Sequence, residues 1–473
     1  MIRIIATKEM REMSRDGRVR LLGAIVALLT IAALVFGIQQ TERAEHDRSH
    51  AQDRSEAQWE GQGEKNPHVA AHYGTHIFAP TSVATAIDPG VSTYMGRSIR
   101  VEAHKRNLAS HSAAEDGGSL SRMGAFSVTT VLLQLVPLLI IALGYGLWSL
   151  ERERGTLRQV LSTGVERQHL FWGKSLGMTA LISALLVPAG ALVIGTLSAL
   201  GGGDADTALR IVLLMLAYGL YFGIFAAITI TVSAKAGSSR SALVLMIGVW
   251  VFFCLIIPRV SAEIGGRLAP LPSEAKLQRD IASTLEKGPD GTQEREEAVE
   301  EIIDELMAEQ GMENAGLMID QSILNGIELQ AEAVWEDRGY DHHIHDLEEQ
   351  ISQQEKMISM GGWLSPTLAM RTLSAGLCGT DYAHHRNFTN HVEDWRKEFV
   401  TYLNNAFAEN AGSDGWNYKA DPEVWKNSPA FEYSNPPVRF ALEQHMMSVI
   451  ALFLWFSLTL LIAYRASMSV RVV

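Results

Sequence analysis

Cysteine is scarce in this sequence of 473 residues, and basic residues are in the minority. Of the two cysteines, Cys254 lies inside an apolar run and Cys378 inside a long polar stretch, so we expect no disulfide within the chain. The 40 Lys and Arg residues against 53 Asp and Glu residues give a net charge of -13. A nucleic-acid-binding protein needs a basic face, so this balance argues against that class.

The sequence also lacks the motifs of an enzyme. No phosphate-binding loop of the form GxxxxGK[ST] occurs, because the segment GGGD lacks the lysine and FWGKS lacks the upstream glycine. There is no HExxH motif of a zinc protease, and no set of nucleophile, base and acid can be matched. A catalytic enzyme is therefore the weakest interpretation, and any nucleotide would have to be bound by another subunit.

Long apolar runs are the main feature that the sequence does have. Six of them approach the length of about 20 residues that a membrane-spanning helix needs. They cover residues 20–38, 126–148, 176–199, 210–232, 241–258 and 446–464. The first run has no small-residue cleavage site, so it is predicted to be an uncleaved anchor. The apolar centres hold no Asp, Glu, Lys or Arg, which disfavours an ion-coupled carrier. The predicted fold is an all-α polytopic membrane protein with six transmembrane helices.

Basic residues mark one side of this predicted bundle. They are concentrated in residues 1–19, in the links 149–175 and 233–240, and in the tail 465–473. The link GGGDAD on the other side has no basic residue. By the positive-inside rule, both termini and the two basic links are expected to be cytoplasmic.

Two long segments, residues 39–125 and 259–445, then fall on the extracytoplasmic side. The first is polar, and the second, larger one is mainly helical in pattern. In EREEAVEEIIDELMAEQG the apolar residues recur at helical spacing and form one apolar face. Either the first segment or another subunit could cover that face.

The basic link 149–175 contains a short predicted helix. In LERERGTLRQVLSTGVERQHLFWGK, Thr156 and Gln159 fit a capping box at a helix start, and Gly164 is a natural helix end. The apolar side chains of this helix form one stripe: Leu157, Val160 and Leu161. So short a helix is marginal alone, and we expect it to form by packing against something else. The preceding charged residues could pair with a soluble partner: Glu151, Arg152, Glu153 and Arg154.

This link resembles the coupling helix between the second and third spans of ABC-2 family exporter permeases. The resemblance lies in the charged run, the pair Gly155 and Thr156, the short helix and a later Gly-Lys pair. The first residues, ATKEMREMSRDGRVR, are similar to the amphipathic connecting helix of the family, here residues 1–19. Residues 72–107 and 364–399 look like the outer segments of a branch of uncharacterised permeases with large periplasmic insertions.

The resemblance implies the membrane subunit of an ATP-driven exporter in the bacterial inner membrane. Family members work with two copies of a cytoplasmic ATPase, which binds ATP and magnesium, and with a second permease that is identical or homologous. No cofactor is expected in this chain, and the extracytoplasmic segments could dock a periplasmic partner. The alternative is a membrane-anchored scaffold or metal-handling assembly factor that acts through its periplasmic domains without an ATPase.

Two further sets of residues leave alternatives open. Polar side chains within the spans could line a substrate path or serve only kinks and helix packing: Gln134, Tyr145, Tyr218 and Tyr221. Histidines recur in three groups: His68, His72 and His76; His342, His343 and His345; His384, His385 and His391. Pro67 and Gly74 interrupt the first group, and the second is the densest candidate for a metal site. Histidines on a polar surface are more often unliganded, so no metal site is predicted.

Overall fold

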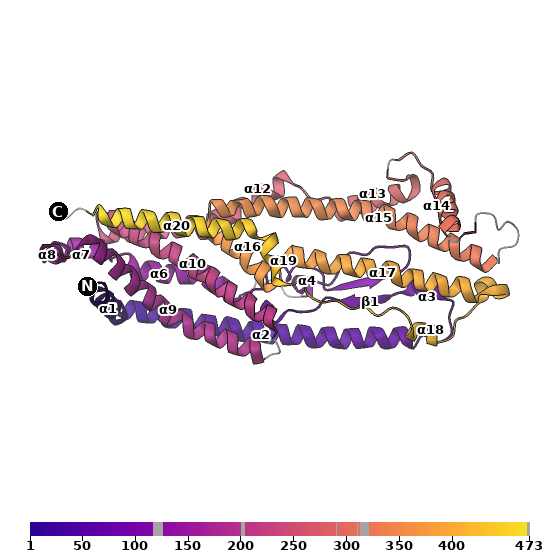
Figure 1. Ribbon diagram of the computed structural model, residues 1–473, viewed down its shortest axis with the longest axis horizontal. Coiled ribbons are helices and arrows are strands. Elements are labelled where there is room, and N and C mark those ends of the chain that lie inside the picture. Colours follow the sequence, from indigo (N-terminus) through magenta and orange to yellow (C-terminus); the bar gives the residue numbers. More distant parts are fainter. Residues whose placement is uncertain (117–125, 200–203, 290, 310, 313–320, 471–473) are drawn as a thin grey trace.

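The computed structural model describes residues 1–116, 126–199, 204–289, 291–309, 311–312 and 321–470, and these form a long bundle of helices (Figure 1). The elements up to the third span are α1 (Ile2–Arg15), α2 (Gly17–Glu60), α3 (Pro67–Tyr73), β1 (Thr75–Phe78), β2 (Ser98–Val101), α4 (Ala113–Asp116), α5 (Val128–Thr130), α6 (Val136–Gly144), α7 (Ser149–Glu153), α8 (Thr156–Ser162) and α9 (Arg167–Ala199). The later elements are α10 (Ala205–Lys235), α11 (Ser239–Val251), α12 (Ile257–Leu268), α13 (Glu274–Lys287), α14 (Arg295–Glu309), α15 (Gln321–Met360), α16 (Pro366–Cys378), α17 (Tyr382–Asn410), α18 (Glu423–Lys426), α19 (Val438–Gln444) and α20 (Met446–Met468).

Six helical stretches of the described chain are long and apolar enough to cross a membrane, which confirms the predicted all-α polytopic fold. The second and fourth, Val128–Glu153 and Ala205–Lys235, are the most enclosed, with 61% and 56% of their most apolar windows buried. The corresponding fraction in the other four is between 20% and 28%. The second and fourth stretches therefore form the centre of the bundle, and the others leave apolar surface free for lipid.

Two of the spans are interrupted by π-helical turns, at Val131–Leu135 and Phe252–Ile256. Each turn lies just before a proline, Pro137 or Pro258, which has no backbone N–H to donate to the preceding turn. Side chains donate to carbonyls of these turns instead. The hydroxyl of Tyr221 donates to Leu133 O at 2.7 Å, and that of Ser365 donates to Phe253 O at 2.7 Å. The kinks thus have a local cause, and neighbouring helices satisfy their backbone.

Helix α2 extends far beyond the first apolar run. Its 44 residues rise about 66 Å at 1.5 Å per residue, roughly twice the hydrocarbon thickness of a bilayer. The polar part of residues 39–125 therefore begins as a continuation of the first span. Here we call the C-terminal part of α2, together with α3, β1, β2, α13 to α15, α17 and α18, the distal half; it lies at the end of the molecule opposite both termini (Figure 1).

The distal half has a core that joins the two outer segments. Strands β1 and β2 pair antiparallel, with Ile77 opposite Ile99. These two side chains pack with Trp59 at the end of α2 and with Phe399 and Leu403 of α17. The apolar face predicted in residues 295–309 belongs to α14 and is covered by α15. Its partner is thus a neighbouring helix of the same segment, and neither the first segment nor a second subunit is needed there.

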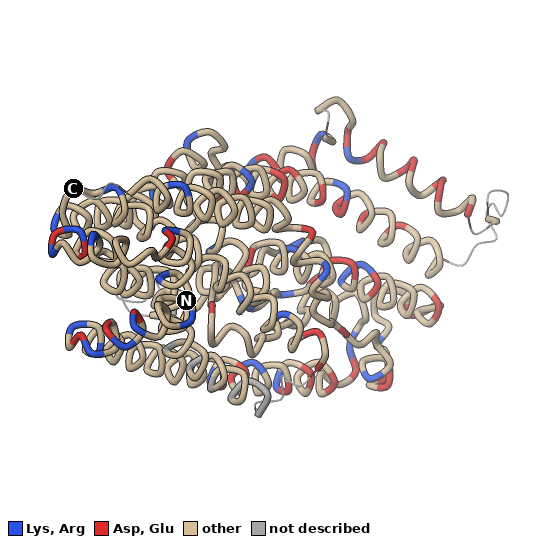
Figure 2. Tube along the Cα trace, turned by 60° about the vertical axis from the view of Figure 1, so that its left-hand side comes forward, with Lys and Arg blue, Asp and Glu red and all other residues tan. Residues whose placement is uncertain are grey.

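Buried ion pairs hold the two long helices of the distal half together. Arg396 of α17 is 3% exposed and pairs with Glu393 at 2.7 Å and with Asp337 of α15. Arg106, from the loop after β2, reaches Asp341 of α15 at 2.7 Å. Since removing one partner of a buried pair leaves an unpaired charge, these contacts fix how α15, α17 and the β2 loop fit together. Figure 2 shows acidic residues along the helices at this end of the molecule.

Helix α16 lies in the core of the membrane bundle, although its sequence belongs to the second outer segment. It packs on α10 and α20, and its buried apolar residues belong to the same core cluster as those of the spans: Ala369, Met370, Leu373, Leu377 and Cys378. Cys254 lies in that cluster too, so both cysteines, which are free, are buried in one core. The expectation that they lie in separate environments was therefore wrong.

Candidate coupling site

Helices α7 and α8 form the link between the second and third spans, at the end of the molecule where both termini lie (Figure 1). Gly155 separates them in a left-handed conformation, with φ of 73°. Only glycine adopts this conformation without strain, so it permits the sharp turn from α7 into α8. Gly164 follows α8 with φ of 85° and ends the helix as predicted.

The predicted capping box of α8 does not form. Gly155 occupies the N-cap position, and no side chain caps the first turn. Thr156 is already the first helical residue, and its hydroxyl donates to Glu151 O of α7 at 3.2 Å. The threonine therefore braces the turn between the two helices, because the positive φ of the glycine moves the helix start by one residue.

The apolar stripe of α8 faces the protein itself. Leu157 is 1% exposed and belongs to the core of the span bundle, and Val160 and Leu161 pack against that core. The stripe is therefore not available to a partner, and the short helix forms against the spans of its own chain. The exposed residues on its other face are basic or polar: Arg158, Gln159 and Ser162, with the exposed Arg154 just before the helix.

The charged residues of α7 are also engaged within the chain. Arg152 donates to Ser233 O and Ala234 O at 3.2 and 3.0 Å, which satisfies carbonyls at the C-terminal end of α10. Glu153 accepts from the backbone N–H and the hydroxyl of Ser239, at 3.0 and 2.7 Å, at the N-terminal end of α11. Helix α7 is thus tied to the ends of two spans, and of the four charged residues Glu153 and Arg154 are exposed.

Glu151 belongs to a buried charge cluster, which we define as Lys8, Glu9, Glu151 and Lys174. Lys174 is 1% exposed and lies 2.8 Å from Glu9 and 2.9 Å from Glu151. Lys8 reaches Glu151 at 2.9 Å. Burial alone would lower the pKa of Lys8, but the hydrogen bond to Glu151 and the charge of Glu9 outweigh it and raise the pKa. The cluster joins α1, α7 and α9 with complementary charges.

Two glycines let α1 approach α9 closely enough to form that cluster. A Cβ at Gly173 would lie 2.5 Å from Ile5, and one at Gly177 would lie 2.8 Å from Ala6 O. Small residues four apart are a common device for close helix packing in membranes. The later Gly-Lys pair of the link therefore has a structural reason: the glycine opens space and the lysine pairs with Glu9.

Three of the four polar side chains predicted within the spans make hydrogen bonds inside the chain. Tyr218 donates to Thr129 at 3.2 Å, and Tyr221 donates to Leu133 O at the π-helical turn. Gln134 accepts from Trp250 through its backbone O at 2.9 Å. The hydroxyl of Tyr145 lies 3.4 Å from Arg18, near the end where the termini lie. A role of these residues in a substrate path stays a prediction.

A profile of the family described as ABC-2 family transporter protein matches residues 3–466, nearly the whole chain. The chain belongs to this family. It is accordingly an ABC transporter permease, and α7 with α8 is its link between spans two and three. No curated protein matches the sequence.

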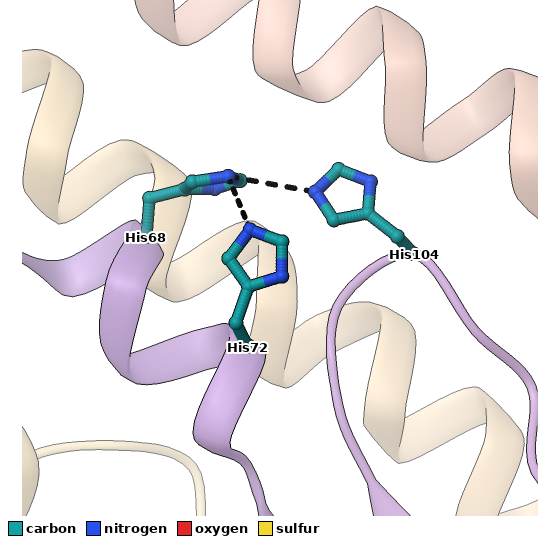
Figure 3. Close-up of side chains that lie close together, drawn as sticks. All are labelled: His68, His72 and His104. Carbon is teal, nitrogen blue, oxygen red and sulfur yellow. Dashed lines mark hydrogen bonds between the residues drawn. The ribbon is translucent and has the colours of Figure 1, made fainter.

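Three histidines of this ABC-2 permease lie close together, in a group that the sequence did not indicate. His68 and His72 lie on α3, whereas His76 lies on β1, since Gly74 ends the helix as anticipated. His104, in the loop after β2, joins the first two, and the ring nitrogens of the three lie within 4.8 Å of one another (Figure 3). Among the described residues this is the only such group of potential metal ligands.

The electrostatics of the three rings differ. Burial lowers the pKa of His68 to about 4 and also lowers the pKa of His72. A hydrogen bond to Glu336 raises the pKa of His104.

The second histidine group does not form such a cluster. The candidates His342, His343 and His345 lie along α15, and the ring of His343 is hydrogen-bonded to the hydroxyl of Thr284 at 2.7 Å.

The third histidine group is divided between two environments. His384 is buried and bonded to Asp381, whose other oxygen lies 2.5 Å from His445. Burial alone would raise the pKa of Asp381, but the hydrogen bonds from the two histidines hold it well below its usual range. Burial lowers the pKa of His385 to about 4, and His391 bonds the backbone of its own helix.

Proposed function

We propose that the permease couples ATP hydrolysis by a separate ATPase subunit to the movement or extrusion of a substrate, and that the exposed face of α8 receives the ATPase. The observation that carries this proposal is the arrangement of α7 and α8. Apolar side chains anchor α8 and hydrogen bonds anchor α7 to the spans, and a largely basic and polar surface is left exposed at the end that holds both termini.

The contacts of α7 supply a route for force. The hydroxyl of Ser233 on α10 accepts from the backbone N–H groups of Trp148 and Ser149, at 3.0 and 3.3 Å. Arg152 holds the same helix end, and Glu151 holds α1 and α9 through Lys8 and Lys174. A push on α8 would therefore move α7, the end of the central span α10 and the start of α9 as one rigid body.

The proposed assembly is the one that the family resemblance implies. Two copies of a cytoplasmic ATPase bind ATP and magnesium, and two permeases, identical or homologous, form the path in the inner membrane. Both termini and α8 then face the cytoplasm, since the ATPase must reach them. The basic residues of this end support that orientation.

A charge reversal on the exposed face of α8 tests the proposal. Arg154→Glu combined with Arg158→Glu leaves the buried stripe intact and should reduce copurification of the ATPase from native membranes by at least about tenfold, roughly 1.4 kcal/mol. The matched control is Arg279→Glu on α13, also an exposed arginine on a helix. An unchanged amount of ATPase with the double variant, at an unchanged melting temperature, would contradict the proposed contact.

The second candidate function is that of a membrane-anchored scaffold or metal-handling assembly factor. The convergence of His68, His72 and His104 favours it. It predicts that no ATPase copurifies and that nucleotide leaves the conformation of the permease unchanged, so the same purification separates the two candidates.

A further inference from the structure

The three histidines of the distal half converge through the same ring atom. The Nε2 atom of His68 lies 3.1 Å from Nε2 of His72 and 3.4 Å from Nε2 of His104. Four ligands placed tetrahedrally at 2.0–2.1 Å from a zinc ion are separated from one another by about 3.3–3.4 Å. Two of the three separations are thus close to the spacing that a shared ion requires, and all three are within 4.8 Å. Figure 3 shows the rings turned toward one another.

Two of the rings have partners on the opposite nitrogen, which is the pattern that orients metal-binding histidines. The Nδ1 atom of His104 lies 2.5 Å from Oε2 of Glu336, on α15. The Nδ1 atom of His68 lies 3.4 Å from Oδ1 of Asn404, on α17, whose side chain is 1% exposed. An Nδ1–H that donates to an oxygen leaves the lone pair of Nε2 directed at the common centre.

The backbone fixes the positions of these rings. Asn66 caps α3 by accepting from the backbone N–H groups of His68 and Val69, at 2.9 and 3.2 Å. His68 and His72 are then four residues apart on one helical face. His104 has φ of 61°, one of two non-glycine residues of the described chain with positive φ. Such a conformation is costly and persists where its surroundings hold it, often at functional sites.

We propose that His68, His72 and His104 bind one divalent first-row transition-metal ion of the zinc type. Three imidazoles suit such an ion, and a fourth position is left for water or an exchangeable ligand. His68 is buried while His72 is exposed, so the site is enclosed on one side and open to solvent on the other. The ion would replace the hydrogen bonds that otherwise join three basic nitrogens.

The site would also tie the distal half together. Its ligands come from α3 and the loop after β2, and their partners Glu336 and Asn404 come from α15 and α17. A bound ion would therefore connect the first outer segment to the two long helices of the second. Ligand binding to the folded state alone raises its stability, so the ion should raise the melting temperature.

Zinc titration of the full-length protein tests the site. The permease is purified in detergent through a tag without histidines, stripped with EDTA and titrated with Zn²⁺ against a chromophoric chelator. One ion per chain should bind with micromolar or tighter affinity. His72→Ala or His104→Ala should abolish this binding, and Glu336→Gln should weaken it by roughly 10–100-fold. The matched control His76→Ala lies on β1, outside the cluster, and should leave binding unchanged.

A second measurement keeps the result independent of folding. The melting curve of His72→Ala without metal should match that of the parent, because His72 is exposed and its removal empties no core. With saturating Zn²⁺ the parent and His76→Ala should melt at a higher temperature, whereas His72→Ala and His104→Ala should not respond. Absence of stoichiometric binding by the folded parent, or binding that survives both ligand variants, would overturn the proposal.

Discussion

The two polar clusters of this permease differ in whether their polar groups are balanced by partners of opposite charge. The charge cluster of Lys8, Glu9, Glu151 and Lys174 contains both signs of charge, so every buried group has a partner inside the chain. The histidine cluster directs three basic nitrogens at one point without an acid between them. A cluster with balanced charges holds helices together, whereas three nitrogens with no acid between them offer lone pairs to a cation.

The largest expected effect comes from breaking the charge cluster. Lys174→Met removes the buried cation that Glu9 and Glu151 share and leaves them with the partly exposed Lys8 alone. It should destabilise the protein by about 3–5 kcal/mol. Lys8→Met is the control, since the Lys8 side chain is 44% exposed and a partly exposed pair contributes about 1 kcal/mol or less. Thermal unfolding in detergent measures both. Adding Glu9→Gln and Glu151→Gln to Lys174→Met should restore most of the loss; equal melting of parent and Lys174→Met would refute the role of the cluster.

An intermediate effect is expected from pushing α1 away from α9. Gly177→Leu places a side chain against Ala6 O and Glu9, and overpacking of this kind costs typically about 1–3 kcal/mol. Gly219→Leu on α10 is the control, because a Cβ there meets no atom within 4 Å. Protease cleavage within α1 should be faster in Gly177→Leu alone. Equal cleavage of the two variants would show that the close approach is not needed.

A smaller effect, dependent on pH, is expected at Glu355 of α15. Burial and the nearby charge of Asp381 raise the pKa of Glu355 to about 7, from an ordinary value of 4.5. Between pH 4.5 and about pH 7 the folded protein keeps a proton on Glu355 that the unfolded chain releases, so the free energy of unfolding falls as the pH rises. Glu355→Gln should therefore stabilise the protein by about 1–2 kcal/mol at pH 8, after allowance for partial exposure, and by almost nothing near pH 4.5. The same gain at both pH values would show that the carboxylate charge is not the cause.

The sequence predicted the spans well, because an apolar run of about 20 residues with few charges matches the thickness of a bilayer. It also predicted that Gly164 ends α8, since a glycine after a short helical pattern is a strong local signal. It did not reveal that Leu157 faces the spans. Periodicity identifies an apolar face, and only tertiary packing decides what covers that face.

The histidine cluster shows the same limit. The spacing of His68 and His72 was visible in the sequence, but His104 lies in a loop whose position depends on β1, β2 and α15. The strand pair brings that loop to α3, and nothing near residue 104 signals it. Helix α16 was missed as a part of the membrane core because its 13 residues are too short to read as a span.

Photo-crosslinking at α8 tests the central claim most directly. A photoreactive residue is placed at Gln159, on the exposed face, or at Leu157, which is 1% exposed. Both variants are irradiated in native membranes, and the adducts are identified by mass spectrometry. The account predicts an adduct with a soluble ATPase from position 159 and only adducts within the permease from position 157. An ATPase adduct from position 157 alone, or none from either position, would contradict it.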